Sequence, residues 1–279
     1  MDQPLPPGLY IVATPIGNLG DMTSRAADTL RRVDYILAED KRVTAKLLAH
    51  LGAKAPMTAY HDYSDETLRE RILADLSGKA VALVSDAGTP LISDPGYKLV
   101  RAARRAGQAV HTLPGPCAAI AALTLAGLPT DRFLFLGFLP AKSKARTEAI
   151  TEIADLRATL VLYESGSRLA ACLAALRDIL GDREAAVVRE ISKLHEEIVT
   201  GKLRELAERY AELPPKGEIV IVVGPPLEPK AVSDSDLDAA LRASLAKFSP
   251  SRAAADVAER LGVPRKRAYA RALGLASKD

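Results

Sequence analysis

The sequence contains few cysteines and no tryptophan. Cys117 and Cys172 are the two cysteines among 279 residues, too few for a disulfide framework, so we expect a reducing compartment. Aromatic residues make up 4% of the chain. Unstacked RNA bases are commonly held by aromatic side chains. The composition therefore argues against a large stacking platform for bases.

Long apolar runs are also missing. The longest, residues 118–128, is interrupted by Thr124 and Gly127 and falls short of the roughly 20 residues that span a bilayer. Residues 1–4 do not begin a basic region followed by an apolar one, as a signal peptide would. We therefore expect a cytoplasmic protein without a membrane partner.

Several familiar catalytic motifs do not occur. No strand candidate is followed by G-x-G-x-x-G, and the patterns G-x-x-x-x-G-K-[ST] and G-x-S-x-G are absent. The four histidines have no ligand spacing among themselves, so we expect no metal site. Neither the usual nucleotide-binding loops nor a serine-hydrolase elbow explains this chain.

What is present is typical of a globular α/β protein. Hydrophobic residues make up 48% and charged residues 26% of the chain, whose length suits two domains and a small third. The net charge of +3 is modest, so an anionic partner needs a local basic patch.

Residues 81–96 are the most informative stretch. An apolar run, 81–84, ends in a turn rich in Gly, Pro, Ser and Asp, which predicts a buried strand followed by a loop and a helix. Asp94 suits the N-cap of that helix, Pro95 its first position and Gly107 its C-terminal cap. In open α/β sheets, such a loop lies where ligands bind.

Alternating strands and helices predict an α/β domain with a largely parallel sheet over residues 1–130. Residues 131–228 predict a second α/β domain, whose last strands lack the spacing of βαβ repeats, so its sheet should be mixed. We expect residues 140–146 to form a basic connecting loop and residues 225–229 a linker. The expected strands are 9–13, 35–38, 57–60, 81–84 and 110–113, then 133–138, 159–163, 185–189, 197–200 and 219–223.

Residues 232–279 predict a small basic helical domain. Three short helices fit between 234 and 273, and their spacing resembles a helix-turn-helix. From Ser249 onward there are seven Lys or Arg and three acids. This balance favours nucleic-acid binding over a merely solvated domain.

Three loops share one composition, with Gly and Pro among small residues at predicted strand ends: residues 14–21, 85–94 and 114–118. Small residues let a ligand touch the backbone. One such loop alone is more often a tight turn, but three in one sheet favour a ligand site. Residues 39–42, which are Glu39, Asp40, Lys41 and Arg42, add a charged turn that could face Asp21 and Arg25.

These loops resemble a known family. In order, the chain contains Thr14-Pro15-Ile16-Gly17-Asn18, Glu39-Asp40-Lys41-Arg42, the block from Ser85 to Gly96, Pro114-Gly115-Pro116-Cys117-Ala118, Gly137-Phe138-Leu139-Pro140, Tyr163-Glu164-Ser165, Arg189-Glu190 and Lys216-Gly217-Glu218. Over residues 8–224 the sequence is similar to the bacterial small-subunit ribosomal RNA cytidine 2′-O-methyltransferases of the tetrapyrrole-methylase superfamily. Lys41 stands where threonine is expected, and Gly166-Ser167 where Thr-His or Pro-His is common.

The resemblance implies two α/β domains of tetrapyrrole-methylase type with S-adenosylmethionine bound in the cleft between them, and a homodimer. It implies a ribose in the decoding region of 16S ribosomal RNA as target, in free RNA or in the 30S subunit. It places cofactor contacts on Pro15, Asp86, Ala87, Gly88, Ser93, Pro114, Gly115, Cys117, Ala118, Tyr163, Glu164 and Arg189.

Methyl transfer to a hydroxyl gains from a base, for which Asp21, Glu39 and Asp40 are the candidates and remain unresolved. Substrate contacts are expected from Arg25, Lys41, Arg42, Lys142, Lys144 and Arg146. Two alternatives stay open. A tetrapyrrole methyltransferase of the same fold would not need the basic tail, and a DNA-binding regulator with a sensing cleft would not explain the charged turn at 39–42.

Overall fold

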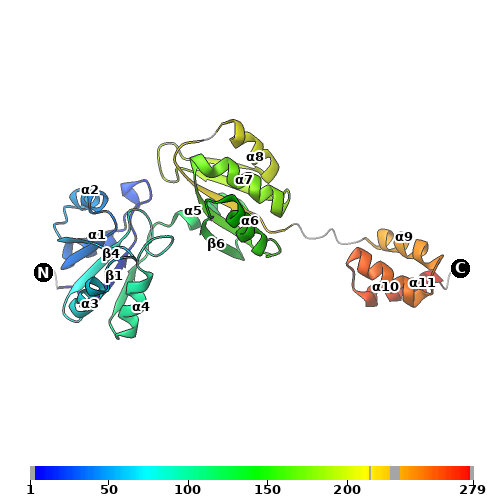
Figure 1. Ribbon diagram of the computed structural model, residues 1–279, viewed down its shortest axis with the longest axis horizontal. Helices are drawn as coiled ribbons and strands as arrows, with labels where there is room; N and C mark the ends of the chain where they lie inside the picture. The colour runs from blue at the N-terminus through cyan, green and yellow to red at the C-terminus, as the bar shows by residue number, and fades with distance from the viewer. Residues whose placement is uncertain (1–3, 214, 227–232, 277–279) are drawn as a thin grey trace. The chain divides into compact units, whose positions relative to one another are not determined.

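The computed structural model describes residues 4–213, 215–226 and 233–276 (Figure 1). Two compact units divide the chain, Met1–Pro226 and Leu227–Asp279, and each is described by itself. Residues 227–229 of the expected linker lie outside the described residues, as do two of the charges counted in the tail, Lys278 and Asp279. No helix in the described ranges is both long and apolar enough to cross a membrane.

The first sheet is entirely parallel, as predicted. Every residue of its central strands β1 and β4 is buried, because helices cover both faces and leave no side for water. Its five strands match the expected ones to within a residue. In spatial order they are β3 (Met57–Ala59), β2 (Tyr35–Ala38), β4 (Ala80–Val84), β1 (Gly8–Val12) and β5 (Val110–Leu113).

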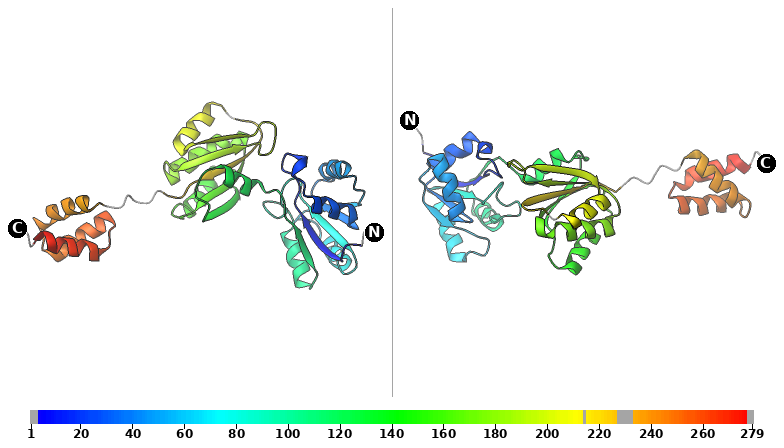
Figure 2. Two further views of the ribbon diagram at one scale, coloured as in Figure 1. Left: turned by 180° about the vertical axis from the view of Figure 1, so that it is seen from behind. Right: turned by 90° about the horizontal axis from the view of Figure 1, so that it is seen from above.

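Two helices cover each face of this sheet (Figure 2). On one face, Leu30 of α1 (Ser24–Arg32) and Leu48 of α2 (Lys41–Leu51) join one core cluster. On the other face, Ile72 of α3 (Glu66–Asp75) and Leu99 of α4 (Tyr97–Arg105) join another. A short 3-10 turn, η1 (Leu19–Asp21), precedes α1.

The start of α4 differs from the sequence prediction. Asp94 does not cap the helix; α4 begins at Tyr97 after Gly96, whose φ of 131° only glycine adopts readily. The predicted end is confirmed, since Gly107 follows α4 in the left-handed conformation. The Asp94 carboxyl instead hydrogen-bonds Ser85, in the loop that precedes the helix.

The second sheet is mixed, as predicted. β6 pairs with β7 in parallel, whereas the other neighbours are antiparallel. Three helices pack on one face: α6 (Ser143–Glu152), α7 (Gly166–Leu180) and α8 (Leu203–Glu212). In spatial order the strands are β6 (Phe133–Phe138), β7 (Thr159–Ser165), β10 (Glu218–Val223), β8 (Glu184–Arg189) and β9 (Glu197–Lys202).

The other face of the second sheet is covered by α5 (Ala118–Leu125). Its Ala122 and Leu123 share a core cluster with Val161 and Val222. The sequence prediction placed residues 1–130 in the first domain, yet this helix packs on the second sheet. Its run of small and apolar residues has no polar stripe to indicate which partner it packs against.

Residues 140–146 also differ from the prediction of a basic loop. Ser143 begins α6, so Lys144 and Arg146 lie in its first turns. Arg146 is buried on this helix, 9% exposed. It points toward the protein and not into solvent.

The C-terminal unit has a core of its own. Leu237 and Leu241 of α9 (Asp234–Leu245), Val257 of α10 (Pro250–Leu261) and Ala268 of α11 (Arg265–Ala276) form one buried cluster. The three helices confirm the expected helical domain; Ser249 precedes α10, and Gly262 ends it in the left-handed conformation.

Candidate active site

The three Gly/Pro loops meet at one edge of the first sheet. Thr14 and Gly88 form a bridge in which each backbone N–H donates to the other's carbonyl, at 2.9 and 3.0 Å. The Thr89 hydroxyl donates to the Pro116 carbonyl at 2.9 Å, which attaches the third loop. The charged turn is attached as well, because the Asp40 N–H donates to the Asp86 carboxylate at 3.0 Å.

A pocket of about 440 Å³ opens at this junction. Its volume falls within the roughly 300–1,000 Å³ of small-molecule sites. Both α/β domains contribute to its wall, as the family resemblance implied. The lining residues are Ile16, Glu39, Asp86, Ala87, Gly88, Thr89, Ile92, Ser93, Asp94 and Ala118, followed by Phe138, Tyr163, Glu164, Ser165, Ile191, Gly217, Glu218, Ile219 and Val220.

The charged lining of this pocket has one sign. Five acidic residues line it, and none of the described lining residues is Lys or Arg. Ile16, Phe138 and Ile191 supply apolar surface between them. A wall of this kind complements a ligand with an apolar body and positive charge, and it disfavours a phosphate.

Two of these carboxyls are perturbed by their surroundings. Burial raises the pKa of Asp94 to about 6, and the nearby Glu39 and Asp86 carboxylates add to the effect. Burial, followed by the Asp86 charge, also raises the pKa of Glu39. Tyr163 lies beside them; burial raises the pKa of its phenol to about 12, and its oxygen accepts the Ala119 N–H at 3.2 Å. Carboxyls with raised pKa values in a cleft are candidates for proton transfer.

Glu164 is 2% exposed and lines the pocket from the second domain. Its Oε1 accepts the Ser165 N–H at 2.9 Å and lies 3.2 Å from Nε of Arg168. The Cys172 thiol of α7 hydrogen-bonds this carboxylate, so the charged group of Glu164 belongs to the second core and not to the open part of the pocket.

Four non-glycine residues around the pocket hold left-handed backbone. Leu91 and Ser93 have φ values of 75° and 65°, and Glu190 and Ser192 have 52° and 66°. Strained backbone of this kind gathers at functional sites. Ser192 also donates a hydrogen bond to the Asp21 carboxylate, joining a loop of the second domain to one of the first.

The structure places most of the predicted cofactor residues on the pocket wall. Those on the wall are Asp86, Ala87, Gly88, Ser93, Ala118, Tyr163 and Glu164. Arg189 is not among them; its Nε donates to Glu197 at 3.0 Å instead. The pocket wall also lacks Pro15, Pro114, Gly115 and Cys117. Cys117 nevertheless hydrogen-bonds the phenol of Tyr163, which does line the pocket.

Sequence reasoning missed several wall residues. Asp94 was interpreted as a helix cap, and its raised pKa could not be foreseen because it depends on carboxylates from other loops. Phe138, Ile191 and Glu218 come from the second sheet and the loop after β8, and no local pattern aligns them with the first-domain loops. The Gly137-Phe138 and Gly217-Glu218 motifs quoted above were the sequence signals that could have identified Phe138 and Glu218.

Among the three candidate bases, only Glu39 lines the pocket. Asp40 caps α2 by accepting the Arg42 N–H at 2.8 Å and pairs with the Arg42 guanidinium at 2.6 Å. These hydrogen bonds lower the pKa of Asp40 to about 2. A carboxylate whose pKa lies so far below neutral pH is a weak base.

The predicted substrate residues are spread over the surface, with one exception. Arg25, Lys41, Arg42, Lys142 and Lys144 are exposed. Arg146 is buried, with its Nε unpartnered among the described atoms, and therefore cannot reach RNA as a loop residue would.

Gly166, a departure from the family pattern, is required where it stands. A Cβ at this position would lie 1.9 Å from the Pro215 carbonyl oxygen, so a larger residue would displace the chain. The described residues contain no cluster of three or more His, Cys, Asp or Glu placed to hold a metal ion.

Two α/β domains, one with a parallel and one with a mixed sheet, and a shared pocket at strand ends define a class of protein. Residues 8–207 match the family model described as Tetrapyrrole (Corrin/Porphyrin) Methylases. Uroporphyrin-III-C-methyltransferase from Thermus thermophilus shares the fold with a TM-score of 0.55 and 23% identity, over 77% of this chain and 93% of that one. A diphthine synthase does so with a TM-score of 0.61 and 16% identity, over 77% and 89%.

Relatives with higher sequence identity narrow the assignment within this family. The sequence is 57% identical to ribosomal RNA small subunit methyltransferase I of Erythrobacter litoralis over 98% of this chain and 97% of that protein. It is 46% identical to the protein of the same name from Mesorhizobium japonicum over 98% and 94%. Residues 231–276 match the model described as RsmI C-terminal HTH domain. The chain therefore belongs to the tetrapyrrole methylase family, within its ribosomal RNA small subunit methyltransferase I branch.

Proposed function

We propose that this chain transfers a methyl group from S-adenosylmethionine to the 2′-hydroxyl of a cytidine ribose in the decoding region of 16S ribosomal RNA. The observation that carries the proposal is the two-domain pocket, lined by five acidic residues and by no Lys or Arg among its described residues. It occurs in a chain whose near-full-length relatives are named as ribosomal RNA methyltransferases.

The pocket residues fit this cofactor. S-adenosylmethionine supplies a methyl group on a positively charged sulfonium, together with an ammonium and a nucleoside. The bare backbone at Gly88 leaves space that a Cβ would fill, since that atom would lie 3.3 Å from Ile16. Asp86 and Ser93 offer acceptors for its donors.

Glu39 is the group that we assign as general base. It lines the pocket, and burial raises its pKa toward the range in which a carboxylate accepts a proton effectively. Its role is to take the proton from the ribose hydroxyl as that oxygen attacks. A positioned base contributes roughly 10²–10⁴-fold, and alignment of the reactants up to about 7–11 kcal/mol of the barrier.

Because the pocket is acidic, we expect the RNA phosphates to bind outside it. Arg25, Lys41, Lys142 and Lys144 are exposed cations that can hold phosphates while one ribose enters. We further propose that the enzyme works in the cytoplasm, and that it is a homodimer, as the family resemblance implies.

Incubation with methyl-labelled S-adenosylmethionine and four separate acceptors tests the proposal. The acceptors are 30S subunits, deproteinised 16S RNA, a reduced tetrapyrrole and duplex DNA. We expect label in 16S RNA, on a ribose, in the 30S or the free-RNA sample. Label in the tetrapyrrole, or in no acceptor although the cofactor binds, would contradict the proposal. Light scattering of the same preparation tests the dimer.

A further inference from the structure

Helix α4 carries an outer face of one charge sign. Leu99 and Ala103 are buried against the first sheet, whereas Lys98, Arg101, Arg104 and Arg105 are exposed. At 3.6 residues per turn the four cations fall within about 120° of the helix circumference, opposite the buried pair. The face that they form is called the α4 basic face below.

The neighbouring helix shows what an ordinary solvated face looks like in this protein. On α3, which packs beside α4, Glu66, Glu70 and Asp75 alternate with Arg69 and Arg71. Two of these acids are in ion pairs, Glu66 with Arg69 at 3.1 Å and Asp75 with Lys79 at 2.8 Å. Such mixed charge needs no partner.

The α4 basic face has no such neutralisation. The helix itself contains no acidic residue. None of its four cations forms an ion pair with another described residue: Lys98 donates to the backbone oxygen of Asp62 at 3.0 Å, and Arg101 lies 3.4 Å from the Tyr97 hydroxyl. Four like charges within one helix repel each other, which an anionic partner would relieve.

Aromatic side chains stand among these cations. Tyr63 is 97% exposed and lies 5.7 Å from the Lys98 ammonium, and Tyr97 is 59% exposed at the first position of the helix. Cations interleaved with exposed aromatics are the surface chemistry of nucleic-acid binding. An anionic membrane would favour a broader apolar face than one tyrosine on the helix.

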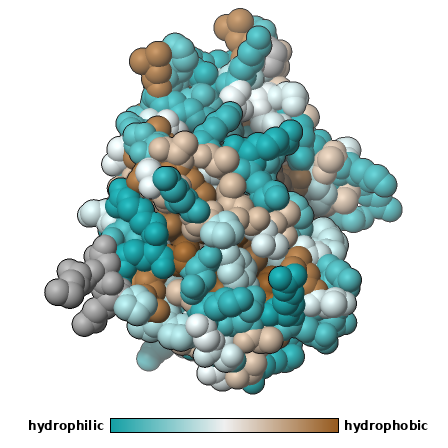
Figure 3. Space-filling view, turned by 90° about the vertical axis from the view of Figure 1, so that its left-hand side faces the viewer, coloured by the Kyte–Doolittle hydropathy of each residue, from teal (hydrophilic) through white to brown (hydrophobic). Residues whose placement is uncertain are grey.

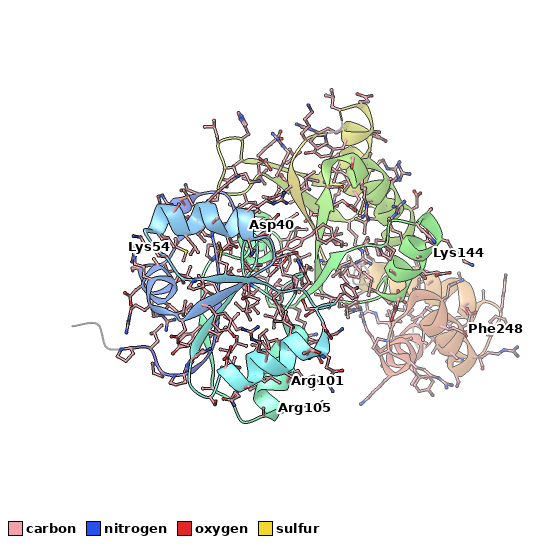
Figure 4. The ribbon with its side chains drawn as sticks, turned by 60° about the vertical axis from the view of Figure 1, so that its left-hand side comes forward. Asp40, Lys54, Arg101, Arg105, Lys144 and Phe248 are labelled. Atoms are coloured by element: carbon pink, nitrogen blue, oxygen red, sulfur yellow. The ribbon has the colours of Figure 1, made fainter. Side chains whose placement is uncertain are left out.

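The position of α4 links this face to the pocket. Ser93 and Asp94 line the pocket, and the helix begins three residues later and runs about 13 Å. Figure 4 labels Arg101 and Arg105 on this helix, well apart from Lys54. Figure 3 shows one face of the molecule, on which hydrophilic residues surround a central area of more apolar ones.

We propose that the α4 basic face binds the phosphate backbone of ribosomal RNA beside the methylated nucleotide. The inference rests on the proposed function and adds a substrate-binding surface to it. Contacts to phosphates fix register without reading sequence. The face would therefore hold the RNA while the pocket selects the ribose.

The test compares two triple variants with the full-length chain. The first carries Arg101→Gln, Arg104→Gln and Arg105→Gln. The matched control removes three other exposed cations, by Lys54→Gln, Arg132→Gln and Arg157→Gln. Binding to 30S subunits is measured over a range of salt, with cofactor affinity and dimer size as checks on folding. The α4 variant should flatten the slope of log affinity against log salt by about 2–3, while the control stays near wild type.

The possible outcomes distinguish the role of the α4 basic face from the proposed methyltransferase function. An α4 variant with the wild-type slope, or a control that loses as much, overturns the inference while the proposed function stands. A wild-type enzyme that binds the cofactor but neither binds nor methylates 30S subunits overturns both. Stronger binding of the wild type to phosphatidylglycerol vesicles than to 30S subunits also overturns the inference.

Discussion

Neighbouring residues in this protein take opposite roles because their surroundings differ. Glu39 and Asp40 are adjacent in sequence and both acidic. Glu39 faces the pocket, where burial raises its pKa, whereas Asp40 caps a helix and pairs with Arg42, which lowers its pKa to about 2. Environment, and not residue type, selects the candidate base.

Replacement of Glu39 tests this assignment. Glu39→Gln should lower kcat by roughly 10²–10⁴-fold, since the amide cannot accept the proton, with a small change in cofactor affinity. Single-turnover methylation of 30S subunits and calorimetry with S-adenosylmethionine measure the two effects. Asp40→Asn is the matched control, because asparagine caps a helix as well as aspartate does. Equal losses in the two variants would argue against Glu39 as base.

Asp94 gives a prediction for stability against pH. Its pKa rises from 3.8 to about 6 on folding, so the folded state prefers the neutral acid. Ionisation therefore lowers the free energy of unfolding as pH rises from about 4 to about 6, and the loss persists above that. Allowing for partial exposure, we expect about 1 kcal/mol.

Asp94→Asn should remove this pH-dependent loss in the free energy of unfolding. The melting temperature without cofactor should rise by about 2–4 °C at pH 7.5 and change little at pH 4. Differential scanning calorimetry at the two pH values measures it. A variant that is destabilised equally at both would show that the carboxylate is structurally required.

At the scale of elements, the loop between β4 and α4 forms the site. Gly88 has a φ of 84° and exchanges backbone hydrogen bonds with Thr14, which fixes two loops against each other. The strained residues Leu91 and Ser93 follow in the same loop. The conformation of this one loop places the Asp86, Ser93 and Asp94 side chains in one wall.

Gly88→Val tests the loop. The new side chain should abolish binding of S-adenosylmethionine, because it fills the space beside Ile16, and strained backbone should cost roughly 1–3 kcal/mol of stability. Gly107→Val separates the two effects. Gly107 has a similar φ of 70° with nothing within 4 Å of its Cβ position, so this variant should lose stability but keep cofactor affinity. Calorimetry and urea unfolding provide the measurements; intact cofactor binding by Gly88→Val would reject the pocket assignment.

At the scale of the whole molecule, the chain consists of two compact units. The first contains both sheets and the pocket; the second is a separate helical core. Within the second unit, Arg267 pairs with Asp234 and Arg271 with Asp238, at 2.8 and 2.6 Å. The charge available to RNA is therefore smaller than the sequence count, with Arg252, Arg260, Arg265 and Lys266 as exposed cations of α10 and α11.

Truncation after Pro226 tests the role of the second unit. We expect unchanged cofactor affinity, since the pocket lies wholly in the first unit, and weaker binding to 30S subunits. The salt slope should decrease by about 3, in line with the four exposed cations of α10 and α11 named above. Filter binding at several salt concentrations measures it. An unchanged slope would mean that the C-terminal unit does not touch the RNA.

The sequence by itself determined the elements and the family. Apolar runs such as 81–84 and 219–223 predicted buried strands, Gly107 predicted a helix end, and the quoted loops predicted a methylase. These features are local, because backbone propensities and turn chemistry act over a few neighbouring residues.

Only the tertiary structure decided which element packs on which sheet and which acid faces the pocket. α5 joins the second core, Arg146 is buried, and Asp94 lines a wall instead of capping α4. The physical reason is that burial and charge coupling depend on residues brought together from distant parts of the chain. Local sequence does not specify these partners, and folding does.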